Sequence, residues 1–363
     1  MKQYFFLICI SITYFQSCNT EKQIREKASD GIIHLEDTIY STIPDLPRLC
    51  DAMELEKRYI EIEGTKLYVE IEGKGTPVVL INGGPGGTHH YFHPWFSKLK
   101  KKHTIIYYDQ RGTGLSGFNP GAGYTFKQAT KDLDALRKAL GFSKWIVFGY
   151  SYGGGLAQYY TLRYPENTLG LILNSAHPVF KSDYFKSEQQ KFISQKEKDQ
   201  FDVVTQKAIQ DRKNGKLSMA AFLYNMAANG DWKRQNYYKP TKEEMIRSAL
   251  YEWVNDRGFN SIMSKNLSQY NFKGAFNNCP IPTLIFEGKH DLTWGPDKAK
   301  IFKANHPNAS FVFFEQSGHQ IFKDEPKKFI NEVLKFTKKL KPISQESIKT
   351  WKNNMMNNIE PEN

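Results

Sequence analysis

Gly149-Tyr150-Ser151-Tyr152-Gly153 is the stretch that decides the fold, because of the residues on either side of it. The apolar run Trp145-Ile146-Val147-Phe148 precedes it and is typical of a buried strand, whereas residues 154–160 are typical of a helix start. A serine in a sharp turn between a strand and a helix needs small neighbours, because its backbone is strained and the two elements pack closely. The helix start supplies unpaired N–H groups beside the hydroxyl. The pattern predicts that Ser151 is a nucleophile.

A serine nucleophile needs a base and a group that orients the base. Residues 281–286 are typical of a buried strand, and Asp291 lies in the loop after it. Residues 310–314 are typical of another strand, and His319 lies in the loop that follows. Catalytic groups of an open parallel sheet collect at the carboxyl ends of its strands. We therefore predict a catalytic triad of Ser151, Asp291 and His319, in the chain order that this architecture uses.

A second glycine-rich loop, Asn82-Gly83-Gly84-Pro85-Gly86-Gly87, follows the apolar strand 78–81. Pro85 has no N–H group and cannot donate a hydrogen bond. We therefore expect the backbone N–H groups of Gly84 and Tyr152 to form an oxyanion hole. The alternative is an ordinary glycine turn. A phosphate-binding loop is disfavoured, because no Lys-Ser or Lys-Thr pair follows the glycines.

Three motifs together resemble the proline iminopeptidase family of α/β-hydrolases: Gly-Gly-Pro-Gly at 83–86, Asp-Gln-Arg-Gly-Thr-Gly-Leu-Ser at 109–116, and Gly-Tyr-Ser-Tyr-Gly-Gly at 149–154. The resemblance covers residues 57–178 and 279–340. It implies a serine aminopeptidase that removes an N-terminal residue, often proline, from short peptides. Asn82 stands where many members carry a histidine, at a position that shapes the oxyanion loop. We interpret Asp109 and Arg111 as structural, in an ion pair or a turn brace.

The 363 residues, 40% of them hydrophobic and 14% aromatic, suffice for one α/β domain with an inserted subdomain. Strands alternate with helical stretches at 126–140 and 323–340, and the runs 58–63 and 66–71 around Gly64 predict an antiparallel hairpin. The expected fold class is α/β, an α/β-hydrolase fold whose mainly parallel sheet is flanked by helices and carries an inserted helical cap. The expected parts are a signal peptide at 1–18, a tether and N-terminal extension at 19–54, the hydrolase core at 55–178 and 279–342, the helical cap at 179–278, and a frayed polar tail at 343–363.

The first residues predict export. Met1-Lys2-Gln3 gives a positive start, and residues 4–15 form an apolar run of signal-peptide length. Ser17 directly before Cys18 resembles a bacterial lipoprotein processing site, so Cys18 is the expected lipidation residue of a membrane lipoprotein facing the periplasm. The alternative is an ordinary cleaved signal with an incidental cysteine. Of the other cysteines, Cys50 and Cys279 would reach an oxidising compartment, either paired or as two buried thiols.

The net charge of +12 comes from scattered lysines, which disfavours nucleic acid as a partner and favours weak attraction to an anionic membrane surface. The expected partner is a short peptide or another small acyl substrate.

Within the cap, Glu252 beside Tyr251 and Trp253 is the preferred anchor for a substrate amine, because an ammonium would meet a carboxylate and aromatic faces together. The alternative is that Glu252 is an exposed helix residue.

Three histidines, His89, His90 and His93, raise the question of a metal. We expect no metal and no cofactor, because no cysteine or carboxylate lies near them at a metal-binding spacing in the sequence.

The hypothesis is a serine hydrolase in which Ser151 attacks a carbonyl, His319 acts as base and then as acid, and Asp291 orients the imidazole. An esterase or amidase on the same scaffold is the first alternative. A catalytically inactive binding lipoprotein is the second.

Overall fold

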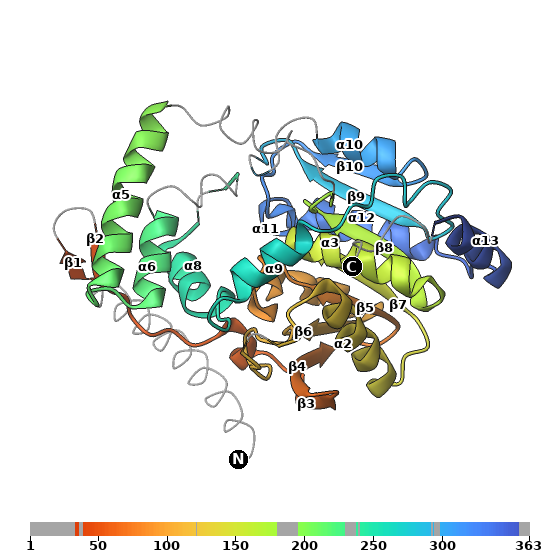
Figure 1. Ribbon diagram of the computed structural model, residues 1–363, viewed down its shortest axis with the longest axis horizontal. Coiled ribbons are helices and arrows are strands. Elements are labelled where there is room, and N and C mark those ends of the chain that lie inside the picture. Colours follow the sequence, from red (N-terminus) through yellow and green to blue (C-terminus); the bar gives the residue numbers. More distant parts are fainter. Residues whose placement is uncertain are drawn as a thin grey trace, which may run out of the picture. The chain divides into compact units, whose positions relative to one another are not determined.

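The computed structural model describes residues 33–35, 39–120, 122–179, 195–228, 237–238, 240–291, 293 and 298–355 (Figure 1). The chain divides into two compact units. The smaller comprises residues 1–47, 195–230 and 240–250, and the larger comprises residues 48–194, 231–239 and 251–363. The segment with the predicted signal peptide and Cys18 lies outside the described residues.

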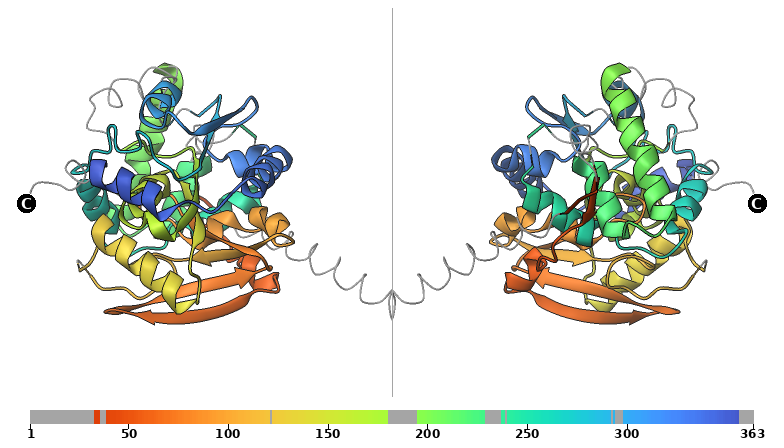
Figure 2. Two further views of the ribbon diagram at one scale, coloured as in Figure 1. Left: turned by 90° about the vertical axis from the view of Figure 1, so that its right-hand side faces the viewer. Right: turned by 90° about the vertical axis from the view of Figure 1, so that its left-hand side faces the viewer.

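An eight-stranded sheet forms the centre of the larger unit, in the order β10-β9-β8-β7-β5-β6-β4-β3. The strands are β3 (Glu56–Ile62), β4 (Thr65–Glu72), β5 (Thr76–Ile81), β6 (His103–Tyr108), β7 (Trp145–Tyr150), β8 (Thr168–Asn174), β9 (Thr283–Gly288) and β10 (Ser310–Phe314). All neighbours from β6 to β10 pair in parallel, whereas β4 is antiparallel to both β3 and β6. The hairpin of β3 and β4, orange in Figure 2, forms one edge of this sheet, and its antiparallel pairing is the one that the sequence predicts.

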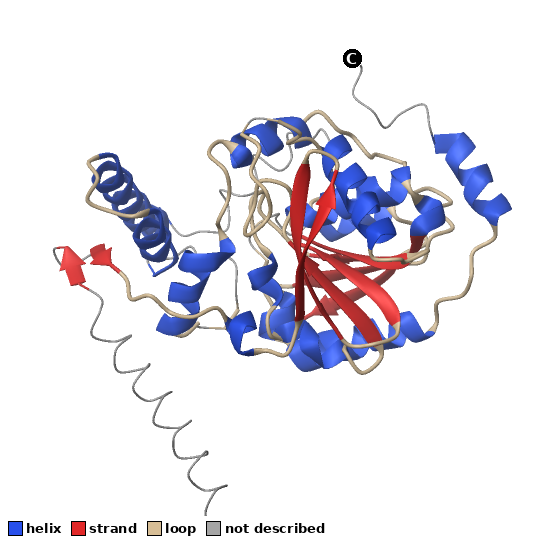
Figure 3. Ribbon diagram, turned by 90° about the horizontal axis from the view of Figure 1, so that it is seen from below, coloured by secondary structure: helices blue, strands red, loops and turns tan. Residues whose placement is uncertain are grey.

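Helices lie on both sides of the sheet (Figure 3). They are α2 (Phe126–Ala139), α3 (Tyr152–Arg163), α9 (Phe259–Leu267), α10 (Lys298–Asn305), α11 (Ile321–Asp324), α12 (Pro326–Lys338) and α13 (Gln345–Met355), with the short 3-10 helices η2 (Leu49–Ala52), η3 (His89–Phe92), η4 (Trp95–Leu99) and η5 (Pro165–Asn167). Alternate residues of each central strand point to opposite faces. In β5, Val79 and Ile81 join the core cluster that contains α2 and α3, whereas Val78 and Leu80 join the cluster that contains η4 and α12. Both faces are buried, which explains why these strands are almost entirely apolar.

The smaller unit contains the strands β1 (Ile33–Leu35) and β2 (Ile39–Thr42), which pair antiparallel. Its helices are α5 (Gln195–Lys213), α6 (Met219–Met226) and α8 (Lys242–Arg247), and the π-helical turn η7 (Ser248–Glu252) continues from α8 into the larger unit. The amide of Asn225 in α6 accepts from the backbone N–H of Tyr40, 2.8 Å away, and donates to its carbonyl at 2.7 Å. Asn225 thereby fastens β2 to α6.

The mainly parallel sheet with flanking helices confirms the predicted fold class. Residues 251–278 group with the larger unit, because residues 254–256 bond to the 112–114 turn: Gly114 N donates to the Val254 carbonyl at 2.7 Å and Asp256 N donates to the Gly112 carbonyl at 2.9 Å.

The expected frayed tail is wrong for its described part. Residues 345–355 form α13, and Ile348 and Trp351 are buried in a core cluster of the larger unit. These two apolar residues lie three positions apart and therefore share one helix face, which buries them although the segment is polar as a whole. Residues 356–363 lie outside the described residues.

Candidate active site

Ser151 lies at the turn between β7 and α3, as the sequence predicts. Its backbone has φ 54° and ψ −120°, a conformation that L residues rarely adopt and that costs of order 1–3 kcal/mol. Three backbone hydrogen bonds hold it there: Ser151 N donates to Asn174 O at 3.1 Å, and Ser151 O accepts from Gly154 N at 2.9 Å and His177 N at 2.8 Å. A strained backbone that neighbouring residues hold in place by hydrogen bonds is the geometry expected at a nucleophilic serine.

Glycines around this turn allow the close packing that the strain requires. A Cβ atom on Gly153 would lie 2.3 Å from the carbonyl oxygen of Ile81, and one on Gly149 would lie 2.5 Å from that of Gly153. Real Cβ atoms do not approach backbone this closely, so neither position accepts a side chain. The two glycines let α3 begin directly against the ends of β5 and β7.

Asp291 and His319 meet across the loops after β9 and β10. Nδ1 of His319 lies 2.9 Å from Oδ2 of Asp291, and both side chains are buried. A hydrogen bond joins the two loops: His290 N donates to Ser317 O at 2.9 Å. Gly288 allows them to approach this closely, because a Cβ at that position would lie 2.2 Å from Gly318 O. The ring of His319 also packs on Tyr150, the residue before Ser151, with centroids 5.2 Å apart.

Sequence reasoning missed a buried cation beside this pair. Nζ of Lys298, in α10, lies 3.1 Å from Oδ2 of Asp291 and 2.5 Å from Oε2 of Glu287. Burial would raise the pKa of Asp291, but His319 and the Lys298 ammonium outweigh it and hold that pKa well below its usual range. Burial raises the pKa of Glu287 to about 7, although Lys298 opposes the shift. Asp291 is therefore an anion that can hold the His319 ring by its Nδ1 atom.

The glycine loop after β5 lies against Ser151. A Cβ on Gly83 would lie 3.2 Å from Cβ of Ser151. Gly84 has φ 131°, and a Cβ on it would lie 2.5 Å from Gly86 N, so glycine is required there too. Tyr152 is the first residue of α3, and its N–H group therefore has no acceptor within the helix. The loop that carries Gly84 and the N-terminus that carries Tyr152 thus border the same serine, and their role as oxyanion donors stays a prediction.

Asn82 is buried and braces the glycine loop 82–87. Its Nδ2 donates to Gly87 O, and its Oδ1 accepts from Nε2 of Gln110 at 3.1 Å. This amide thereby ties the loop to the Asp109-Gln110-Arg111 turn.

Asp109 and Arg111 both have structural contacts, but not with each other. Asp109 accepts from the backbone N–H groups of His89 and Leu115, each at 2.8 Å. The guanidinium of Arg111 forms a two-pronged ion pair with Asp132, with both N···O distances 2.8 Å. The two residues brace turns, as interpreted from the sequence, through separate partners.

Glu252 is buried, which rules out the alternative of an exposed helix residue. Its Oε1 lies 3.2 Å from Nζ of Lys323, itself buried, and this ion pair neutralises the carboxylate that an incoming ammonium would need. Trp253 packs edge-on against Tyr91 at 5.6 Å, and Tyr91 packs against Tyr150 at 5.8 Å. The segment 251–253 is thereby linked through aromatic rings to the residue before Ser151.

Local spacing in the sequence does not reveal which side chains surround His89 and His93. Cys50 and Glu70 lie beside His89 and His93 in the structure, so a cysteine and a carboxylate do accompany the histidines. His90 lies in a different environment, where its Nε2 accepts from Leu49 N at 3.3 Å.

The structure also answers the question about the thiols: Cys50 and Cys279 are both buried and free, not paired.

Comparison with known proteins identifies the class. The family described as alpha/beta hydrolase fold matches residues 76–326, more than half of the chain. The chain therefore belongs to the α/β-hydrolase fold family. An esterase from Exiguobacterium antarcticum superposes with a TM-score of 0.60 at 25% identity, over 77% of this chain and 98% of the esterase. A thermophilic esterase from Thermogutta terrifontis also gives 0.60, at 19% identity over 79% of this chain and 99% of that one, and supports the fold alone.

Within that family the chain is similar to proline iminopeptidases. The enzyme of that name from Clostridioides difficile is 31% identical over 299 residues, which cover 78% of this chain and 98% of the relative. The one from Saccharolobus solfataricus is 26% identical over 293 residues, or 78% of this chain and 93% of the relative. These relatives and the fold identify the protein as an enzyme, a serine hydrolase similar to prolyl aminopeptidases.

Proposed function

We propose that this hydrolase is an aminopeptidase that releases an N-terminal residue, proline by preference, from short peptides. The observation that carries the proposal is the buried Asp291–His319 pair packed against the strained Ser151 turn. The similarity to proline iminopeptidases supports the choice of substrate.

In the proposed mechanism His319 takes the proton of the Ser151 hydroxyl while that oxygen attacks the carbonyl of the N-terminal residue. Asp291 holds the imidazole by Nδ1 and stabilises the imidazolium that forms. The oxyanion is held by the N–H groups of Gly84 and Tyr152, each worth about 2.7–4 kcal/mol of transition-state stabilisation. His319 then returns the proton to the leaving amine, and water releases the acyl group by the same steps in reverse order.

An aminopeptidase must recognise the free amine of its substrate. Glu252 is the proposed anchor for this amine. Its carboxylate already pairs with the buried Lys323, so the substrate ammonium would compete with that lysine for the carboxylate. A charge-assisted hydrogen bond contributes about 1.5–3 kcal/mol. We expect Glu252→Gln to raise KM for a free-amine substrate roughly tenfold or more and to leave ester hydrolysis nearly unchanged. Equal losses on both substrates would assign Glu252 a structural role instead.

An esterase is the second candidate function. The superposition on the Exiguobacterium antarcticum esterase at 25% identity favours it, and neither the fold nor a triad selects the acyl group. The two candidates differ in whether hydrolysis requires a free N-terminal amine.

Four substrates separate the candidates: proline p-nitroanilide, alanine p-nitroanilide, N-blocked proline p-nitroanilide and a p-nitrophenyl ester. The proposal expects turnover of the two free-amine anilides, with proline ahead, and loss of turnover when the amine is blocked. Ser151→Ala should lower kcat by about 10⁴-fold or more. Turnover of the ester alone would be consistent with a hydrolase but would overturn the proposal that it is a peptidase.

A further inference from the structure

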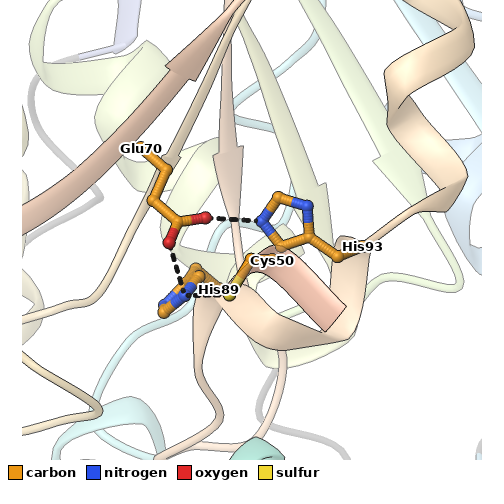
Figure 4. Close-up of side chains that lie close together, drawn as sticks. All are labelled: Cys50, Glu70, His89 and His93. Atoms are coloured by element: carbon orange, nitrogen blue, oxygen red, sulfur yellow. Dashed lines mark hydrogen bonds and ion pairs between the residues drawn. The ribbon is translucent and has the colours of Figure 1, made fainter. Parts of the chain in front are cut away.

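Four buried side chains from three segments of the chain lie together (Figure 4). Cys50 belongs to η2, Glu70 to β4, His89 to η3, and His93 follows η3 directly. None of the four is more than 2% exposed. The group is called the Cys50–His93 cluster below.

The ligand atoms of the cluster are close enough to share one ion. They all lie within 4.8 Å of one another. Nε2 of His93 lies 2.8 Å from Oε2 of Glu70, Nε2 of His89 lies 3.6 Å from Oε1 of Glu70, and Sγ of Cys50 lies 3.9 Å from Nε2 of His89. Zinc–ligand distances of about 2.0–2.3 Å in a tetrahedron place ligand atoms about 3.3–3.6 Å apart. The widest pair would therefore have to contract by about 1 Å.

The contact between His93 and Glu70 is an ion-pair contact, drawn as a dashed line in Figure 4. Nε2 of His93 and Oε2 of Glu70 have no hydrogen-bond partner among the described residues, although they lie 2.8 Å apart. Two buried polar atoms without a hydrogen-bond partner carry a desolvation cost, which a shared cation would remove.

Outer contacts orient the ligands as they do in known metal sites. Nδ1 of His89 lies 2.9 Å from Oδ1 of Asp109, which leaves its Nε2 facing Glu70 and Cys50. The Tyr68 hydroxyl donates to Oε1 of Glu70 at 2.7 Å, whereas Oε2 accepts no hydrogen bond from a described residue. The ring of His93 stacks on Tyr107 with centroids 4.0 Å apart. A carboxylate behind a ligating histidine fixes its tautomer and increases its basicity.

We propose that the Cys50–His93 cluster binds one zinc ion in a structural site. A thiolate, a carboxylate and two neutral imidazoles carry a charge of −2, which balances Zn²⁺. Thiolate and imidazole ligands favour zinc over magnesium or calcium. Four protein ligands leave no open position, which is the pattern of a structural rather than a catalytic zinc site.

The ion would join three segments that are distant in sequence. It would fasten η2, where the larger unit begins, to β4 and to η3. Because η3 begins two residues after Gly87, it would also fix the end of the oxyanion loop. Zinc binding would thereby stabilise the fold and support the site, without taking part in the reaction.

The experiment measures metal directly. The purified full chain is analysed for metal content, and the metal-free chain, prepared with a chelator, is then titrated with CoCl₂ under anaerobic conditions. The proposal expects close to one zinc per chain, a lower Tm after chelation, and a thiolate-to-cobalt charge-transfer band on adding one equivalent of Co²⁺. Added zinc should abolish the band.

Two cysteine variants test the assignment. Cys50→Ser should remove the band, whereas Cys279→Ser, which alters the second buried free thiol among the described residues, should retain it. A folded wild-type chain with no bound metal and no cobalt band overturns the proposal and leaves a metal-free ion network of His89 with Glu70 and Asp109. A band that persists in Cys50→Ser overturns it as well. If Cys50→Ser does not fold, the wild-type metal content and cobalt titration decide the question.

Discussion

Asp291 shares a buried network with Lys298 and Glu287, in which one ammonium faces two carboxylates. His319 and the Lys298 ammonium together hold the pKa of Asp291 well below its usual range, so Asp291 stays ionised and can orient the His319 imidazole. Lys298 touches neither the serine nor the substrate carbonyl in the proposed mechanism, so it is a positioning residue.

Replacing Lys298 alone should destabilise the fold more than replacing Lys298 and Glu287 together. Lys298→Met leaves two carboxylates buried without their cation, which should cost about 3–5 kcal/mol in urea unfolding. The double variant Lys298→Met, Glu287→Gln removes one of those charges and should recover much of the loss. A double variant no more stable than the single one would contradict this account of the network.

The triad candidates and Lys298 also show what a sequence reveals about single residues. Ser151, Asp291 and His319 follow recognisable strands in a fixed order, and a parallel sheet brings such loop residues to one edge. Lys298 follows Asp291 by seven residues with no motif around it, and only the packing of α10 brings it back. Cys50 and Glu70 were missed for the same reason, since no local spacing relates them to His89 and His93.

Among the larger elements, α3 and α10 meet at a buried histidine. His306, just after α10, has its Nε2 atom 3.1 Å from Oε1 of Gln158 in α3, and its ring stacks on Phe276 with centroids 4.1 Å apart. Burial lowers the pKa of His306 to about 3. Folded His306 thus stays neutral at a pH where the unfolded chain binds a proton.

This difference makes stability depend on pH. A lowered folded pKa gives stability that is present above the ordinary value of 6.5 and is lost as the pH falls towards 3. At pH 5 the loss from this one group is about 2 kcal/mol. His306→Gln should therefore show a smaller fall in unfolding free energy between pH 7.5 and pH 5 than the wild type, by about that amount. Parallel pH profiles of the two chains would show that His306 does not contribute.

Helix α13 is the element that sequence reasoning described wrongly. Nε1 of Trp351 donates to Ala275 O at 3.2 Å, and the indole is buried. Trp351→Ala should cost about 3–5 kcal/mol of unfolding free energy. Lys349→Ala, at an exposed position of the same helix, is the matched control and should change stability by no more than about 0.5 kcal/mol. A loss below 1 kcal/mol for Trp351→Ala would restore the description as a tail.

Over the whole molecule, the sheet could be predicted from the sequence because buried parallel strands appear as short apolar runs with glycine-rich turns after them. The limits of the units could not, because they depend on long-range pairing. Residues 251–278 lie within the stretch predicted as a cap, yet an isolated bridge joins Asn255 to Thr113, in the turn after β6, and they group with the larger unit.

We propose, from the sequence, that the protein is a bacterial lipoprotein modified at Cys18. Within the part of the chain that the structure describes, no helix is long and apolar enough to cross a membrane. Cells that express the full chain should incorporate labelled fatty acid into it and hold it in the membrane fraction, and Cys18→Ser should lose the label. Cys9→Ser is the control within the same segment. Unlabelled wild-type protein would favour an ordinary cleaved signal.

The central claim is that Ser151 is the nucleophile of a working hydrolase, and labelling with a fluorophosphonate tests it most directly. The folded wild-type chain is incubated with the probe and mapped by peptide mass spectrometry, alongside Ser151→Ala. The account predicts one adduct, located on Ser151, and none in the variant. A folded wild-type chain without an adduct, or an adduct that remains in Ser151→Ala, would contradict it.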